Sequence, residues 1–164
     1  MATRGKLTEI EKAYIAGFFD GEGSISINKF RANNPNYKCP HYILTVTLTN
    51  TNLEIIEEIH EKLGASKQMR KREWGKSHWK TCYAWMASAN KALIVLKLIR
   101  PYLKVKAKQA DLAISFQESK MSNRKWVSSD KGKTLSPETL ADREAIYKTM
   151  KNLNGSIRNR SRRD

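Results

Sequence analysis

The stretch Ile15-Ala16-Gly17-Phe18-Phe19-Asp20-Gly21-Glu22-Gly23 decides how this chain is interpreted. Ala16 and Gly17 are small residues in an otherwise bulky apolar helical pattern, and a glycine inside a helix costs about 1 kcal/mol relative to alanine. Small residues at such positions let the backbone of another helix come close. We therefore expect a second helix to pack against this one.

Two carboxylates, Asp20 and Glu22, follow at the end of this helix with one glycine between them. The chain is otherwise basic, with 31 Lys and Arg against 16 Asp and Glu. A carboxylate beside a phosphate-binding surface is unfavourable unless a cation lies between them, and oxygen ligands of this kind suit Mg²⁺. For Asp20, hydrogen bonding to backbone amides near the helix end is the stronger expectation. For Glu22, we expect metal binding.

Composition indicates a single globular domain with a polyanionic partner. The chain has 164 residues, 40% of them apolar, a formal net charge of +15 and a pI near 9.9, which favours nucleic acid as the partner. A ribosomal or merely solubilising surface is the alternative. Cys39 and Cys82 are far apart and lack zinc-ligand spacing, so we expect neither a disulfide framework nor a structural zinc.

The sequence predicts an intracellular protein without a membrane partner. Residues 1–6 lack an apolar signal core, and no apolar run is long enough to span a bilayer. The basic helical stretch 104–116 is too mixed in character to form a membrane-binding face. We expect the cytoplasm of a prokaryote or an organelle, which the sequence does not distinguish.

Hydrophobic period and capping signals predict the elements on either side of the opening stretch. Thr8 with Glu11, and Thr51 with Glu54, form capping boxes that start helices, and Gly64 ends the second. The expected helices are 9–19, 52–63, 90–98 and 105–119, and the expected strands are 24–30, 41–49, 67–73 and 79–86. A further helix starts at Ser136-Pro137-Glu138 and ends at Asn154-Gly155.

The order α-β-β-α-β-β-α predicts an α+β fold in which helices cover one face of a four-stranded antiparallel sheet. The other face stays open. We expect a core domain over residues 1–120. Residues 121–164 then form an accessory helix and a basic tail, which ends in four arginines within 158–163.

Alternate strand positions predict that the open face carries hydrogen-bond formers. These are Ser24, Ser26, Asn28, Thr45, Thr47, Gln68, Arg70, Arg72, Thr81 and Tyr83. A two-stranded ribbon fits the major groove of DNA, where such side chains read base edges. An ordinary solvated sheet face is an equal alternative. Five further residues are expected near DNA: Lys29, Arg31, His41, Lys104 and Lys108.

The nine-residue stretch resembles the signature of the LAGLIDADG family of homing endonucleases at its helical, small, acidic and glycine positions. The resemblance extends over about residues 8–120, through the element order and the basic stretch 101–110. Only one such signature is present, and single-signature members are homodimers that pack their signature helices against each other. The resemblance therefore implies a homodimer with Tyr14, Ala16, Gly17 and Phe18 at the interface.

The resemblance also implies a set of active-site residues. Glu22 falls on the metal-binding acid, one methylene longer than the aspartate of many members, and the adjacent carbonyl is that of Gly21. Lys106 matches a lysine of the basic stretch, with simple phosphate contact as the alternative. Asn50 falls where relatives keep a water-orienting polar residue, with a helix cap beside Thr51 as the alternative. The implied metal is Mg²⁺, with Mn²⁺ able to substitute and Ca²⁺ supporting binding without cleavage.

The activity implied is that of an intron-encoded nuclease. It would make a staggered double-strand break in a long, pseudo-palindromic double-stranded DNA target by metal-dependent phosphodiester hydrolysis. Some relatives instead act as maturases on intron RNA, and others only bind DNA, so both remain alternatives. A basic ribonucleoprotein component that stacks Trp74 and Trp79 on RNA is a third, but it leaves the signature unexplained.

Overall fold

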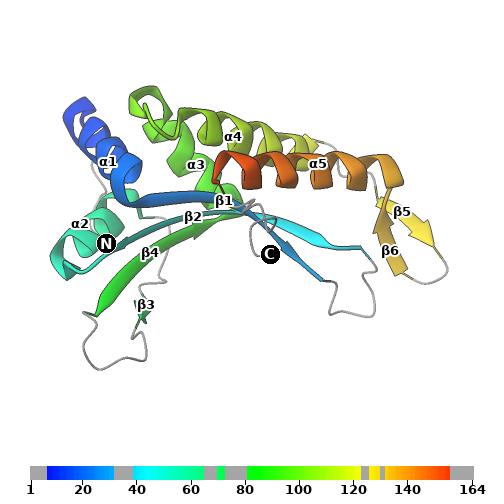
Figure 1. Ribbon diagram of the computed structural model, residues 1–164, viewed down its shortest axis with the longest axis horizontal. Helices are drawn as coiled ribbons and strands as arrows, with labels where there is room; N and C mark the ends of the chain where they lie inside the picture. The colour runs from blue at the N-terminus through cyan, green and yellow to red at the C-terminus, as the bar shows by residue number, and fades with distance from the viewer. Residues whose placement is uncertain are drawn as a thin grey trace, which may run out of the picture.

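The chain folds into a layer of helices over one face of an antiparallel sheet (Figure 1), as seen in a computed structural model that describes residues 7–31, 39–64, 70–72, 81–122, 126–129 and 132–155. The helices are α1 (Glu9–Glu22), α2 (Leu53–Leu63), α3 (Ala89–Ile99), α4 (Ala107–Ser122) and α5 (Pro137–Leu153), with a 3-10 turn η1 (Arg100–Tyr102). The strands are β1 (Gly23–Phe30), β2 (His41–Asn50), β3 (Arg70–Arg72), β4 (Cys82–Ser88), β5 (Trp126–Ser129) and β6 (Gly132–Leu135). The predicted fold class is confirmed.

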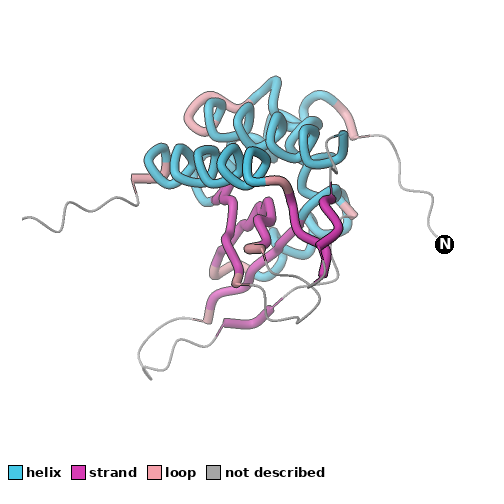
Figure 2. The backbone as a smooth tube through the Cα atoms, turned by 90° about the vertical axis from the view of Figure 1, so that its right-hand side faces the viewer, coloured by secondary structure: helices cyan, strands magenta, loops and turns pink. Residues whose placement is uncertain are grey.

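The main sheet has the strand order β1-β2-β4-β3, and all of its neighbours are antiparallel. In the β1–β2 register, Ser24 lies opposite Thr47 and Ser26 lies opposite Thr45. The tube view shows the strands below the helix layer (Figure 2). Strand β1 and strand β3 form the two edges of this sheet.

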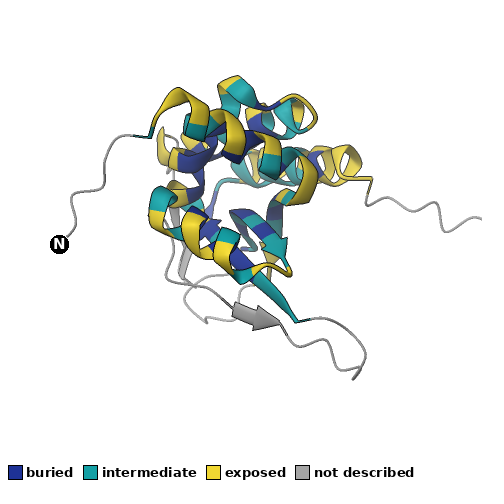
Figure 3. Cartoon of the chain, turned by 90° about the vertical axis from the view of Figure 1, so that its left-hand side faces the viewer, coloured by how far each residue is buried: buried dark blue, intermediate teal, exposed yellow. Residues whose placement is uncertain are grey.

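The core lies between the sheet and the helices, where buried segments face each other (Figure 3). Alternate residues of β1, β2 and β4 supply the sheet side: Ile25, Ile27, Leu44, Val46, Leu48, Trp85 and Ala87. Phe19 of α1 meets Trp85 edge-on, with ring centroids 5.8 Å apart. Ile43 lies opposite Asn28 on the helix-free side of the sheet, because side chains alternate strictly along a strand.

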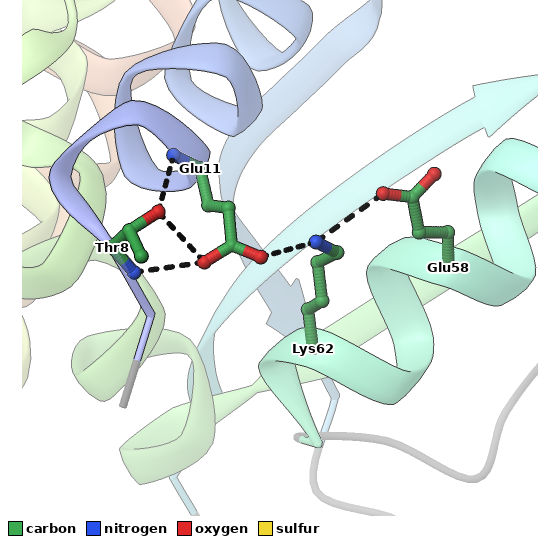
Figure 4. A network of polar contacts seen from close by, with 4 residues as sticks. All are labelled: Thr8, Glu11, Glu58 and Lys62. Carbon is green, nitrogen blue, oxygen red and sulfur yellow. Dashed lines mark hydrogen bonds and ion pairs between the residues drawn. The ribbon is translucent and has the colours of Figure 1, made fainter. Parts of the chain in front are cut away.

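Helix α1 starts at the predicted capping box. Thr8 Oγ1 accepts from the Glu11 amide, and the Glu11 carboxylate accepts from the Thr8 amide at 2.8 Å. The same carboxylate pairs with Lys62 of α2 at 2.5 Å, and Lys62 also reaches Glu58 (Figure 4). Hydrogen bonds from Lys62 and Thr8 lower the pKa of Glu11 to about 2. This network joins the first turn of α1 to the last turns of α2.

The predicted start of α2 was one residue early. Asn52, not Thr51, is the cap, and its side chain accepts from the Ile55 amide. The reason is that Asn50 first accepts from the Asn52 amide at 2.9 Å, which forms a turn that delays the helix. Gly64 ends α2 in the left-handed conformation, as predicted.

Helix α1 extends three residues beyond its predicted end at Phe19 and reaches Glu22. Gly23 then starts β1 without an intervening loop, and its amide donates to the Phe19 carbonyl. A Cβ on Gly23 would lie 2.4 Å from Phe19 Cδ1 and 2.7 Å from the Phe19 carbonyl oxygen. A side chain at this position is therefore excluded by the helix end itself.

Helix α5 packs on α4 and on β1, with Met150 buried in the common core. Ser136 caps its start and Gly155 follows its end with a positive φ of 64°, as the sequence predicted. The Asn154 side chain donates to the Ile25 carbonyl at 2.9 Å. The antiparallel pair β5–β6 before α5 was not predicted, because its two four-residue strands are too short and polar to show a clear alternation.

Candidate metal centre and nucleic-acid interface

Glu22 lies exposed in the last turn of α1. Its carboxylate makes no hydrogen bond or ion pair with the residues that the structure describes. The carbonyls of Gly21 and Glu22 belong to the last turn, where a helix leaves its acceptors without helical partners. A free carboxylate and unpaired carbonyls at the negative end of a helix dipole favour a cation there.

Asp20, two residues before Glu22 in the same helix, has a structural role. Its carboxylate accepts hydrogen bonds from three consecutive backbone amides that lie far away in the sequence. These are the amides of Lys104 at 2.7 Å, Val105 at 3.1 Å and Lys106 at 2.9 Å. Burial raises the pKa of the Asp20 carboxyl, but these amides and the Lys106 charge outweigh burial and hold the pKa below its ordinary value. Asp20 does bond backbone amides, but the expectation that these would be local amides near the helix end is wrong, because the donors lie 84 to 86 residues further along the sequence.

Lys106 is brought to the end of α1 by this anchor. Its ammonium donates to the Asp20 backbone carbonyl, two residues before Glu22. The side chain is half-buried, while Lys104 and Lys108 on either side are exposed. The fold therefore gathers a cation and a free carboxylate, predicted separately from the sequence, at one helix end.

Asn50 lies at the last position of β2, two residues beyond the partner of Gly23. This places its backbone beside the end of α1. Its side-chain oxygen is already committed to the turn before α2 through the Asn52 amide. A turn-forming role is thus established for Asn50, and a role in orienting water stays a prediction.

The helix-free face of the sheet holds most of the predicted hydrogen-bond formers. Ser24, Ser26 and Asn28 on β1 lie opposite Thr47, Thr45 and Ile43 on β2. The Asn28 amide donates to Thr45 Oγ1 at 3.0 Å, so neighbouring side chains hold each other in place. Arg70 and Arg72 occupy positions opposite Ala84 and Cys82, which belong to the same face.

Three predictions for the open face, those for Tyr83, Thr81 and Gln68, are wrong or untested. Tyr83 lies opposite Asn50 and packs against the core, because it shares the side of Trp85 and not that of Cys82. Thr81 lies just before β4, which starts at Cys82, and residues 79–80 of the predicted strand lie outside the described residues. Gln68 lies outside the described residues. Conversely, the sequence pattern missed Ile43, Met86 and Ser88, which the register places on the open face.

The outer ends of β1 and β2 carry the remaining predicted contacts. Arg31 is exposed just after β1, and His41 opens β2 opposite Phe30. Lys29 lies opposite Tyr42, on the helix side of the edge strand, and pairs with Glu144 of α5 at 2.7 Å. Lys29 therefore flanks the open face instead of lying on it.

One side of α1 has no partner within the described chain. Ile10 is 83% exposed and Tyr14 is 55% exposed, and Gly17 and Gly21 continue the same helical stripe. A Cβ added to either glycine would meet nothing within 4 Å. Phe18 is partly buried and stacks on Tyr14. Ala16, expected at a dimer interface, is instead fully buried in this chain's own core, because it points toward the sheet.

The sequence profile described as LAGLIDADG endonuclease matches residues 15–118, which begin at the stretch that carries Asp20 and Glu22. The chain belongs to the LAGLIDADG endonuclease family. No match was found among curated proteins.

Solved structures of LAGLIDADG proteins share the fold. The homing endonuclease I-CvuI, in complex with the I-CreI target, is 19% identical with a TM-score of 0.66, over 95% of this chain and 87% of that chain. The archaeal intron-encoded homing endonuclease I-Vdi141I, complexed with DNA, is 19% identical with a TM-score of 0.66, over 88% and 84%. The meganuclease I-SmaMI, bound to uncleaveable DNA, is 15% identical with a TM-score of 0.66, over 91% and 48%.

The described part of this LAGLIDADG protein includes no helix long and apolar enough to cross a bilayer. Nor do its described residues include three metal-ligating side chains of the His, Cys, Asp or Glu type in one cluster. A single chain thus offers one free carboxylate, Glu22, at the end of its signature helix.

Proposed function

We propose that this protein is a site-specific homing endonuclease that acts as a homodimer on double-stranded DNA. The observation that carries the proposal is the end of α1. There the Lys106 ammonium donates to the Asp20 carbonyl, two residues before an unpaired Glu22, in a chain of net charge +15. A free carboxylate beside a surface that binds phosphate is unfavourable unless a cation lies between the two negative charges.

The unpartnered side of α1 supports the homodimer. Ile10 and Tyr14 expose apolar surface, while Gly17 and Gly21 leave room that no described atom of this chain uses. Glycines in a helix are disfavoured unless a close approach requires them. A second copy of α1 packed here would use that room and bring two Glu22 residues together. I-SmaMI, of which this fold spans 48%, has room for two such units in one chain.

The residues at this helix end fit a magnesium ion. Glu22 and the Gly21 carbonyl offer the hard oxygen ligands that Mg²⁺ prefers, and Mg²⁺ in nucleases takes few protein ligands and completes its shell with water and phosphate oxygens. When bound, the ion would supply Lewis-acid polarisation and an activated water. Mn²⁺ offers similar coordination, and Ca²⁺ is expected to support binding without cleavage.

The chain's own groups then have distinct tasks in phosphodiester hydrolysis. The Glu22 carboxylate would hold the metal ion at the scissile phosphate. The Lys106 ammonium, held by the Asp20 carbonyl, neutralises charge that develops on the phosphoryl oxygens. Asp20 positions Lys106 through the three amides it accepts. No protein nucleophile is needed, because water attacks the phosphorus directly.

The open sheet face supports sequence recognition. Ser24, Ser26, Asn28, Thr45 and Thr47 present hydrogen-bonding groups, and Ile43 and Met86 add apolar contacts suited to thymine methyl groups. Two identical faces related by a two-fold axis would read a long pseudo-palindromic site. Two cleavage centres at that axis would cut one strand each and leave staggered ends.

The test is a selection of cleaved sites. The purified chain is incubated with a randomised DNA pool in Mg²⁺, and the ends produced are sequenced. The proposal predicts discrete staggered ends centred on a two-fold symmetric sequence, and binding without cleavage in Ca²⁺. Tight DNA binding without ends in Mg²⁺ would indicate a binding-only relative, and a preference for structured intron RNA would indicate a maturase. Either result would refute the nuclease.

A further inference from the structure

A groove of about 330 Å³ lies where the edge strand β1 meets the last turns of α5. Its strand wall is Ser26, Asn28, Lys29 and Phe30, its helix wall is Tyr147, Lys151 and Asn154, and its floor is Ile27 and Met150. The hydrogen bond from Asn154 to the Ile25 carbonyl holds the helix end at the strand. In Figure 1 the red end of α5 lies over β1.

The groove is continuous with the open face of the sheet. Ser26 and Asn28 belong to that face by register, and the same two residues line the groove. A ligand that covers the open face and extends past β1 would therefore enter the groove directly. None of the predicted base-reading residues on β2 lies in it.

Each wall of the groove carries one lysine, and the two lysines differ in whether a carboxylate neutralises them. Lys29 is 2.7 Å from the Glu144 carboxylate, so its charge is largely used inside the protein. Lys151 lies over the Tyr147 ring, 5.0 Å from its centroid, and makes no ion pair with any described carboxylate. Of these two lysines, only Lys151 is free to neutralise an external anion.

The dimensions of the sheet place DNA backbones at its edges. Strands lie about 4.8 Å apart, so the first and last of four strands are about 14 Å apart. The major groove is about 12 Å wide. A sheet of this width placed face-on in the groove meets a sugar-phosphate backbone along each edge. The opposite edge strand, β3, has the basic sequence Arg70-Lys71-Arg72. Its positive charge is complementary to the phosphates of the second DNA strand.

We infer that the β1–α5 groove binds the sugar-phosphate backbone of one DNA strand, with Lys151 as the direct phosphate contact. Lys29 and Glu144 are positioning residues that hold α5 against the strand edge. This contact sets the register of the protein on DNA and is indifferent to base sequence. The inference rests on the proposed function, and it extends the DNA-contacting surface of the protein from the sheet to α5.

The test measures DNA affinity of the full chain against salt concentration, on a cleavable site in Ca²⁺. Each phosphate neutralised contributes about 0.9 to the slope of log affinity against log salt. Because the homodimer would lose one phosphate contact from each of its two chains, Lys151→Ala should lower the slope by about 1.8, so that its affinity falls about 12-fold less than that of wild type between 50 and 200 mM salt. Lys151→Arg should keep the wild-type slope. The control is Lys97→Ala, whose lysine pairs with Glu118 within the helix layer.

Base substitutions in the site separate the outcomes. If Lys151 binds phosphate, Lys151→Ala weakens binding by the same factor on every sequence, while the preference among bases is unchanged. A wild-type slope for Lys151→Ala would overturn this inference alone and leave the nuclease intact. A wild-type chain that neither binds nor cuts DNA would overturn the proposed function as well.

Discussion

At the scale of single residues, neighbouring positions of the signature stretch have different roles. Asp20 anchors a distant loop, Glu22 stays free, and Gly23 lets the chain turn from helix to strand without a loop. The sequence predicted that Asp20 would bond local amides and that Glu22 would bind a metal ion. It could not predict which amides, because residues 104–106 are brought to Asp20 only by the packing of α1 beside η1.

Gly23→Ala should destabilise the fold. Its Cβ would lie 2.7 Å from the Phe19 carbonyl oxygen, a backbone atom that cannot move without unwinding the helix end. Overpacking of this kind costs about 1–3 kcal/mol. Urea unfolding of both chains measures the loss. Ser24→Ala, an exposed neighbour, is the control and should change the stability by less than about 0.5 kcal/mol. An unchanged midpoint for Gly23→Ala would refute the close approach.

Asp20→Asn should lower stability and move Lys106. An amide replaces a carboxylate that accepts three backbone amides, and loss of such acceptors costs roughly 1–3 kcal/mol. The pKa of Asp20 is depressed in the folded chain, so its contribution is full above the ordinary carboxyl pKa and is lost as pH falls through the folded value. The stability difference between wild type and variant should therefore shrink below about pH 4. A difference that is constant with pH would contradict this origin.

At the scale of elements, strong local signals predicted structure well and register-dependent details less so. The capping box at Thr8 and the left-handed Gly64 are local, and both were correct. Tyr83 was assigned to the wrong face because the start of β4 depends on its pairing with β2. The capping box also gained a partner that no local pattern reveals, since Lys62 of α2 joins Glu11 through tertiary packing.

At the scale of the whole molecule, the single chain has features that the proposed homodimer would use. It presents one free Glu22 and an unpartnered stripe on the same helix, and the described residues offer no other cluster of metal ligands. The sequence predicted this stripe from its small residues, but it misplaced Ala16. Which small residue faces outward depends on the rotation of α1 against the sheet, and that rotation is fixed by packing of Ile15 and Phe19.

Gly17→Ala should have opposite effects on a monomeric chain and on a homodimer, so it distinguishes the two oligomeric states. In a lone chain the new methyl group meets nothing, so improved helix propensity should stabilise the protein by roughly 0.5–1 kcal/mol. In the homodimer it would enter the space used by the second α1, so the dimer dissociation constant should rise at least tenfold. Sedimentation equilibrium measures that constant. Asn152→Ala, on the exposed side of α5, is the control and should leave it unchanged.

The most direct test of the account is cleavage by Glu22→Gln. On one selected site in Mg²⁺, the variant should bind DNA as tightly as wild type and cut it at least a thousandfold more slowly, because the amide cannot hold the cation. Glu9→Gln, at the other end of the same helix, should cut at the wild-type rate. Wild-type cleavage by Glu22→Gln would contradict the central claim that the free carboxylate at the end of α1 is the metal ligand.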